Sequence, residues 1–167
     1  MRFQFLSQLF FNMPPKVITK NINQTQKLGE KFARQIYLSQ INKNKKLAAV
    51  LGLQGDLGSG KTAFLQGFAK GLGIKEKVLS PTFVLIKKFK IKNPIAVKKF
   101  FKNFYHIDLY RIDSIKNIKE LKLKDIFLNP ENIVAIEWPQ IIKSKLPKSA
   151  IIIKFAFVDK NKREIII

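Results

Sequence analysis

A glycine-rich loop is the segment of this sequence with the clearest chemical signature. Residues Gly55 to Thr62 read G-D-L-G-S-G-K-T, which matches the spacing G-x-x-x-x-G-K-[ST] of phosphate-binding loops. Glycines at these places let the backbone point its N–H groups into a concave nest, and the following helix adds the positive end of its dipole. In such a loop Lys61 binds the outer phosphates, and the Thr62 hydroxyl can ligate Mg²⁺.

The sequence on either side of the loop supports this interpretation. Leu47 to Leu53, just before it, is nearly unbroken in its apolar character, as in a strand buried on both faces. Thr62 to Leu72, just after it, carries apolar residues at helical spacing. A chance match in a lysine-rich chain would lack this strand-and-helix setting. We therefore expect the nucleotide to contact the loop at Leu57, Gly58, Ser59, Gly60, Lys61 and Thr62.

Two carboxylates have the positions that such a site needs. Asp108 and Glu137 each follow directly after an apolar run that is typical of a buried strand. Both would lie at the carboxyl edge of the sheet, where ligands bind in α/β folds. Each alone could be a cap or a surface ion pair, but as a pair beside the loop they favour magnesium binding and the orientation of water. Asp56, inside the loop, is interpreted as structural.

Two further residues lie next to these carboxylates. His106 would share a strand face with Asp108, because side chains alternate with a period of two. A structural role and a catalytic role are both open for this histidine. Trp138, the only tryptophan, directly follows Glu137 and is expected to pack in the core.

Composition excludes several other classes of chemistry. The chain has no cysteine and one histidine, which excludes disulfides, thiol catalysis and a histidine-based zinc site. Its formal net charge of +21 has two interpretations: affinity for a polyanion, or a compositional drift towards lysine, isoleucine and asparagine. No apolar run reaches the ~18–20 residues of a membrane span, so we expect no membrane partner.

The pattern of segments indicates a single α/β domain over residues 16–167, with residues 1–15 as an extension outside the fold. The stretch 90–102 is basic and is expected to be a hairpin tip or an insertion. We expect strands at 16–18, 47–53, 83–89, 104–107, 133–136, 150–158 and 163–167, and helices at 25–39, 62–72 and 118–127.

Four segments together resemble the TsaE (YjeE) family, the bacterial ATPases of the tRNA threonylcarbamoyladenosine (t6A) pathway. In chain order they are Gly55 to Thr62, Ser80 to Phe83, His106 to Arg111, and Glu137 to Pro139. The similarity runs over most of the chain, and the combination is far more specific than the loop alone. It implies a P-loop NTPase-like fold with a mixed, mainly parallel central sheet flanked by helices.

The resemblance also implies roles for residues. Thr62 and Glu137 would ligate Mg²⁺, and Asp108 would be needed for hydrolysis of ATP to ADP. Ser80 to Phe83 would form a switch-like segment near the γ-phosphate, with Thr82 as a further catalytic candidate. The remaining nucleotide contacts would come from Thr25 and Arg163.

The same resemblance implies partners and a place of action. The partners would be the proteins TsaD and TsaB, with tRNA reached indirectly through their complex. Turnover of ATP would sustain repeated modification of adenosine 37 in tRNAs that read ANN codons. The protein would act in the cytoplasm.

Three other functions share parts of this sequence pattern. A small-molecule or nucleoside kinase has the same loop, but it usually adds an arginine-bearing lid, and this chain has only Arg2, Arg34, Arg111 and Arg163. A basic RNA-binding module with a vestigial loop would show an aromatic-and-basic RNA motif, and none appears. A GTPase is disfavoured, because Asn42 to Lys45 lacks the aspartate of the N-K-x-D guanine motif.

Overall fold

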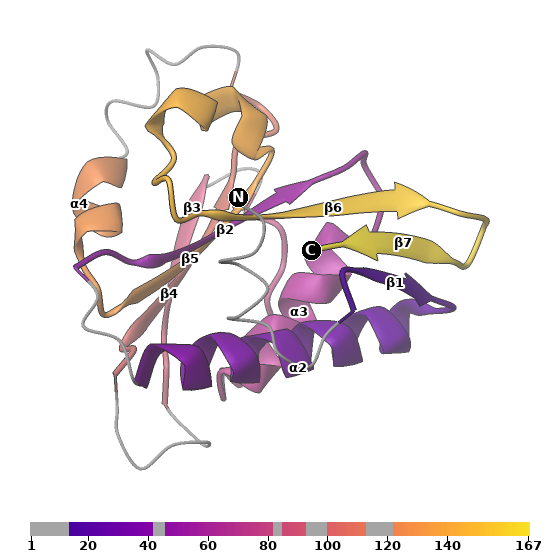
Figure 1. Ribbon diagram of the computed structural model, residues 1–167, viewed down its shortest axis with the longest axis horizontal. Helices are drawn as coiled ribbons and strands as arrows, with labels where there is room; N and C mark the ends of the chain where they lie inside the picture. The colour runs from indigo at the N-terminus through magenta and orange to yellow at the C-terminus, as the bar shows by residue number, and fades with distance from the viewer. Residues whose placement is uncertain (1–13, 42–45, 82–84, 93–99, 113–121) are drawn as a thin grey trace.

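The computed structural model describes residues 14–41, 46–81, 85–92, 100–112 and 122–167. Within these residues a seven-stranded sheet has the order β1-β7-β6-β2-β5-β4-β3 (Figure 1). The strands are β1 Lys16–Thr19, β2 Ala49–Gln54, β3 Ile86–Lys90, β4 Asn103–Asp108, β5 Asn132–Glu137, β6 Ile151–Phe157 and β7 Arg163–Ile166. The helices are α2 Ile22–Ile41, α3 Lys61–Gly71, α4 Leu123–Leu128 and the 3-10 helix η2 Pro139–Lys145.

The centre of the sheet is parallel and its edges are antiparallel. Strands β6, β2, β5 and β4 all run in the same direction, whereas β7 pairs antiparallel with β6 and with β1, and β3 pairs antiparallel with β4. This confirms the expected α/β class with a mixed, mainly parallel sheet. In the register, Glu137 lies opposite both Leu53 and Asp108, so the carboxyl ends of β2, β5 and β4 meet at one edge.

Helices cover both faces of the sheet. α2 and α3 lie on one side, and α4 and η2 lie on the other (Figure 1). Side-chain alternation explains the two layers: in β4, Phe104 is buried under α2 and α3, while Ile107 packs with the α4 side. Phenylalanines are prominent in the core between the sheet and helices α2 and α3, among them Phe32, Phe64 and Phe68. The helix that follows the glycine-rich loop is therefore held by a large aromatic core.

Glycines bring α2 and α3 unusually close together. A Cβ atom added to Gly67 would lie 1.8 Å from the Gln26 carbonyl oxygen, and one added to Gly29 would lie 2.1 Å from the Phe64 carbonyl oxygen. Such distances are far below van der Waals contact, so the backbones can approach only where the side chain is a hydrogen atom. Because α3 begins at Lys61, this contact also sets the position of the loop.

α2 is longer than the helix expected at 25–39, and its N-terminal hydrogen bonds explain the difference. The Asn21 side chain accepts the Gln24 N–H at 3.0 Å, and the Gln24 side chain accepts the Lys20 N–H at 2.8 Å. These caps start the helix three residues early, at Ile22. Although α2 has 20 residues, none of the helices in the described ranges is both long enough and apolar enough to cross a membrane.

Most of the expected elements are present, with shifted ends. The seven strands and the helices at 62–72 and 118–127 correspond to observed elements, but α4 begins at Leu123 and β3 at Ile86. Four expectations fall partly or wholly outside the described residues: the extension 1–15, the start of the strand at 83–89, the tip of the stretch 90–102, and the start of the third helix. The helix η2 was not expected; it begins at Pro139, directly after Trp138, whose φ of 61° is left-handed.

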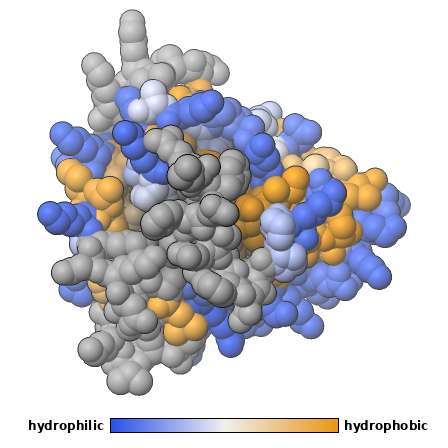
Figure 2. All heavy atoms as spheres, viewed as in Figure 1, coloured by the Kyte–Doolittle hydropathy of each residue, from blue (hydrophilic) through white to orange (hydrophobic). Residues whose placement is uncertain are grey.

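Apolar side chains are exposed on the ribbon that β6 and β7 form. Figure 2 shows orange, hydrophobic surface over the side of the molecule where Figure 1 places these two strands. The residues are Ile152, Phe157, Val158 and Ile166, which are 37% to 52% exposed. Because side chains alternate along a strand and paired residues share a face, Ile152 and Ile166 lie on one face of the ribbon and Phe157 lies on the other, so these side chains do not form one continuous patch.

Candidate nucleotide-binding site

A cavity of about 440 Å³ opens at the carboxyl edge of the parallel strands. Its walls come from six segments: the glycine-rich loop, the start of α2, Ser80 in the segment before β3, the ends of β4 and β5, and the β6–β7 turn. This is the edge where the topology of a parallel sheet creates a crevice for ligands. Among the lining residues are Thr25, Leu57, Gly58, Gly60, Lys61, Thr62, Ser80, Asp108, Glu137, Trp138 and Arg163.

The loop has the backbone shape that its glycines allow. Gly58 and Gly60 have φ values of 75° and 103°, in the left-handed region where other residues are strained. A Cβ on Gly60 would lie 3.6 Å from the side chains of both Thr25 and Arg163, so those residues cover the loop closely. Ser59 is fully buried, and its hydroxyl has no hydrogen-bond partner among the described residues. The loop therefore has the form of an anion nest.

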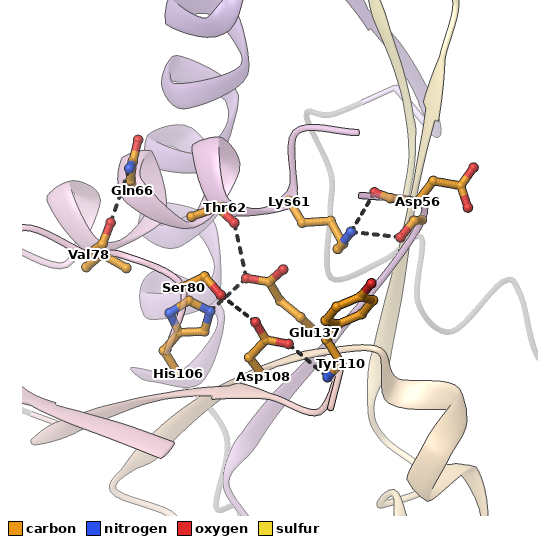
Figure 3. A network of polar contacts seen from close by, with 11 residues as sticks. Asp56, Lys61, Thr62, Gln66, Val78, Ser80, His106, Asp108, Tyr110 and Glu137 are labelled. Carbon is orange, nitrogen blue, oxygen red and sulfur yellow. Dashed lines mark hydrogen bonds and ion pairs between the residues drawn. The ribbon is translucent and has the colours of Figure 1, made fainter. Parts of the chain in front are cut away.

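Lys61 is the cation of this nest. Its Nζ donates to the carbonyl oxygens of Gly55 and Asp56, at 2.7 and 2.8 Å (Figure 3). The same Nζ lies 4.9 Å from the centroid of the Trp138 ring. Burial lowers the pKa of the ammonium group, and the nearby charges of Glu137 and Asp108 oppose that shift. Two carboxylates thus help to keep a buried lysine charged beside the space where phosphates would lie.

Glu137 connects the loop helix to the sheet. Its Oε1 lies 3.4 Å from the Thr62 hydroxyl oxygen and 2.9 Å from Nε2 of His106 (Figure 3). The carboxylate is 4% exposed, at the last residue of β5. Adjacent oxygen ligands of an octahedral Mg²⁺ at 2.0–2.1 Å lie about 3 Å apart, so the Thr62 and Glu137 oxygens fit the expected pair of metal ligands.

Asp108 is held by hydrogen bonds on both oxygens. Its Oδ1 accepts the Tyr110 N–H at 3.0 Å, and its Oδ2 accepts the Ser80 hydroxyl (Figure 3). The register places it beside Glu137, so the two predicted acids are neighbours at the sheet edge. Ser80 belongs to the segment that the sequence indicated as switch-like. The catalytic candidate Thr82 of the same segment lies outside the described residues.

Thr25 and Arg163 both reach the cavity wall, as the sequence prediction requires. The Thr25 hydroxyl pairs with the Thr19 hydroxyl at 2.8 Å, and its methyl group faces Gly60. Nη1 of Arg163 donates to three carbonyl oxygens of the β6–β7 turn at 3.0 to 3.3 Å. The guanidinium carbon lies 4.5 Å from the centroid of the Phe157 ring. A direct contact of either residue with a nucleotide stays a prediction.

Trp138 packs against the core as expected, and it also lines the cavity, which was not expected. It is half-buried, lines the cavity and contacts both Lys61 and the ring of Tyr110, whose centroid is 5.2 Å away. Its left-handed backbone conformation turns the chain sharply at the end of β5, and the indole packs against the α4-side core while also lining the site. The only sequence feature that could have indicated this place at the cavity is that Trp138 directly follows Glu137, a carboxylate at a strand end.

Comparisons with known proteins show the family and the fold of this chain. The model of a family described as "Threonylcarbamoyl adenosine biosynthesis protein TsaE" matches residues 19–165. The TsaE protein of Borreliella burgdorferi is 41% identical over 61% of this chain and 68% of its own length. The Rickettsia prowazekii protein of the same name is 38% identical over 81% and 88%, respectively. The crystal structure of Bacillus subtilis YdiB superposes with a TM-score of 0.64 and 30% identity, covering 90% of this chain and 81% of that one.

Proposed function

The chain belongs to the TsaE family of tRNA threonylcarbamoyladenosine biosynthesis proteins, and from this premise we propose that its part in the pathway is to bind ATP with Mg²⁺ and hydrolyse it. One observation carries the proposal: Lys61, Thr62, Asp108 and Glu137 all line the same cavity at the end of a phosphate-binding loop. Their types match the needs of phosphoryl transfer, in which catalysis is mainly positioning and stabilisation of charge.

The loop and Lys61 would bind the phosphates. The Lys61 ammonium now donates to two backbone carbonyls, and hydrogen bonds between an ammonium and phosphate oxygens are stronger than those to neutral acceptors. Thr62 and Glu137 would hold Mg²⁺, with water and phosphate oxygens completing its shell. The ion would neutralise charge on the outer phosphates.

Asp108 would orient the attacking water and stabilise its loss of a proton. Its carboxylate is fixed by Ser80 and by the Tyr110 backbone, so it can act without losing further freedom. Because Ser80 is the first residue of the switch-like segment, this bond connects that segment to the hydrolytic carboxylate. Thr82 stays a catalytic candidate of the same segment.

A simple assay separates hydrolysis from the kinase alternative. We would incubate the protein with Mg²⁺ and ATP in the absence of any acceptor, and measure ADP and inorganic phosphate. Hydrolysis releases both in equal amounts, whereas a kinase needs an acceptor and retains the phosphoryl group on it. ATP consumption that appears only after nucleosides or small acceptors are added would contradict the proposed function.

We further propose that the ATPase acts with TsaD and TsaB in the cytoplasm, and that tRNA contacts it through that complex. The exposed Phe157 side chain supports a protein partner close to the site, because its ring would lie 3.5 Å from a Cβ atom on Gly58. A pull-down with TsaD and TsaB, with and without ATP, tests this. We expect a complex that depends on ATP, and Phe157→Ser should weaken it. Absence of a complex under both conditions would contradict the partner proposal.

A further inference from the structure

His106 is buried beneath the nucleotide cavity and does not line it. The side chain is 0% exposed in β4, one strand away from Glu137, and its Nε2 lies 2.9 Å from Glu137 Oε1. Because carboxylates only accept hydrogen bonds, the proton of this contact is on Nε2. The hydrogen bond runs diagonally across the β4–β5 pair, where His106 is opposite Ala135.

The other ring nitrogen, Nδ1, argues against a role for His106 in core packing alone. Nδ1 is buried and has no hydrogen-bond partner within the described part of the chain. A buried polar atom without a partner costs about 1–3 kcal/mol, so a histidine that served only the core would be a poor choice here. An aliphatic side chain would fill the same space at no such cost. The polar contact that the ring does make is with the carboxylate.

The hydrogen bond leaves half of the Glu137 carboxylate available. Oε1 receives the His106 proton and is the oxygen near the Thr62 hydroxyl. Oε2 accepts no hydrogen bond from the described residues. A buried carboxylate held at Oε1 keeps a fixed orientation, and because each carboxylate oxygen has two lone pairs, Oε1 beside Thr62 and the free Oε2 can both still face a cation.

We propose that His106 is a positioning residue: its Nε2–H holds the Glu137 carboxylate in the orientation in which it ligates Mg²⁺. This inference rests on the proposed function of the site. Outer partners of metal ligands commonly set the ligand's orientation, and their loss typically costs about 10–100-fold in metal affinity. Glu137 is at the end of a strand and only Thr62 and His106 contact its carboxylate through polar atoms in the described structure. Without the imidazole, the carboxylate would be free to rotate.

The test compares two substitutions at this position. His106→Leu replaces the imidazole with an apolar side chain of similar bulk and so removes the hydrogen-bond donor. His106→Gln places an amide N–H near the position of Nε2. We would measure ATP affinity by calorimetry as a function of Mg²⁺ concentration, together with Mn²⁺ binding by electron paramagnetic resonance. The Mg²⁺ midpoint is the Mg²⁺ concentration that gives half of the maximal ATP binding. We expect His106→Leu to raise this midpoint about 10–100-fold, and the midpoint of His106→Gln to lie close to that of the wild type.

A matched control is available on the same pair of strands. Asn103 of β4 donates to Asn132 of β5 at 2.9 Å, and this buried side-chain bond lies at the end of the strands opposite to the site. Asn103→Leu should lower the free energy of unfolding but leave the Mg²⁺ midpoint unchanged. In a Glu137→Gln background, His106→Leu should have no further effect on metal binding, because the carboxylate that it positions is gone.

The outcomes separate this inference from the proposed function. ATP affinity of the wild-type protein that does not depend on Mg²⁺ would refute the proposed metal site itself. A wild type that depends on Mg²⁺ and a His106→Leu variant with the same midpoint would refute the role of His106 alone. If His106→Leu does not fold, His106→Gln and His106→Asn replace it, since only glutamine is long enough to reach Glu137. Equal midpoints for these two variants would overturn the inference.

Discussion

The close contact of α2 and α3 gives a quantitative prediction about how the loop is positioned. Gly67 of α3 faces the backbone of α2, where an added Cβ would lie 1.8 Å from the Gln26 carbonyl oxygen. Gly71, one turn later, is less crowded, because its Cβ would lie 2.6 Å from the Glu30 carbonyl oxygen. The perturbation is Gly67→Ala, with Gly71→Ala as a graded control on the same helix face.

The two substitutions differ in the distance by which the helices must separate. Carbon and oxygen atoms are in contact at about 3.3 Å, so Gly67→Ala requires a shift of about 1.5 Å and Gly71→Ala about half of that. A gap of 0.5–1 Å already forfeits a quarter to a half of the dispersion energy of the separated atoms. Overpacking typically lowers the free energy of unfolding by about 1–3 kcal/mol. The higher helix propensity of alanine over glycine opposes this loss by about 1 kcal/mol. We therefore expect a loss of about 2 kcal/mol or more for Gly67→Ala, and a change within about 1 kcal/mol for Gly71→Ala.

Urea unfolding followed by circular dichroism measures these differences. ATP affinity measured on the folded variants adds a second test, because α3 begins at Lys61 and a displaced helix moves the loop. We expect Gly67→Ala to weaken ATP binding more than Gly71→Ala does. A Gly67→Ala protein as stable as the wild type, or more stable than Gly71→Ala, would refute the proposed role of the helix contact.

Three further outcomes can be measured independently. Lys61→Met should weaken Mg-ATP binding about 100-fold or more, since it removes charge-assisted hydrogen bonds worth about 1.5–3 kcal/mol each; unchanged affinity by calorimetry would contradict this. Asp108→Asn should lower single-turnover hydrolysis about 10²–10⁴-fold while ATP affinity changes little, and equal rates would show that the carboxylate is not used. Hydrogen bonds from the Lys162 side chain and from backbone N–H groups lower the pKa of Asp159 from 3.8 to about 2. Its stabilising contribution should therefore be complete above pH 4 and disappear as the pH falls towards 2, and acid unfolding of Asp159→Asn should lack that part of the slope.

The sequence predicted the parts of the site that depend on local pattern. The glycine-rich loop is a contiguous motif, and its glycines have the positive φ values that the motif requires. Asp108 and Glu137 follow apolar runs, and the ends of parallel strands necessarily meet at one edge. Both features follow from spacing within one segment, which is why they could be found without a structure.

Other parts depend on contacts between distant segments. The hydrogen bond of His106 to Glu137 joins neighbouring strands, and the two residues are 31 positions apart in sequence. Period-two alternation predicts only on which face of its own strand each side chain lies. The position of the Trp138 side chain depends on its own left-handed backbone conformation, directly after β5. Tryptophan is not a residue type that indicates such a conformation. The close approach of Gly67 to Gln26 likewise depends on how two helices pack. Apolar pattern predicts that α2 and α3 pack, but not which residues touch.

The central claim is that the cavity binds and hydrolyses Mg-ATP through Lys61, Thr62, Asp108 and Glu137. The most direct measurement is a single-turnover assay of ATP labelled in the γ-phosphate, with excess protein in Mg²⁺ or in EDTA, and with Lys61→Ala as the inactive reference. Mg²⁺-dependent release of labelled phosphate by the wild type alone is the result we expect. Labelled ATP recovered intact in every sample, also when TsaD and TsaB are added, would contradict the claim.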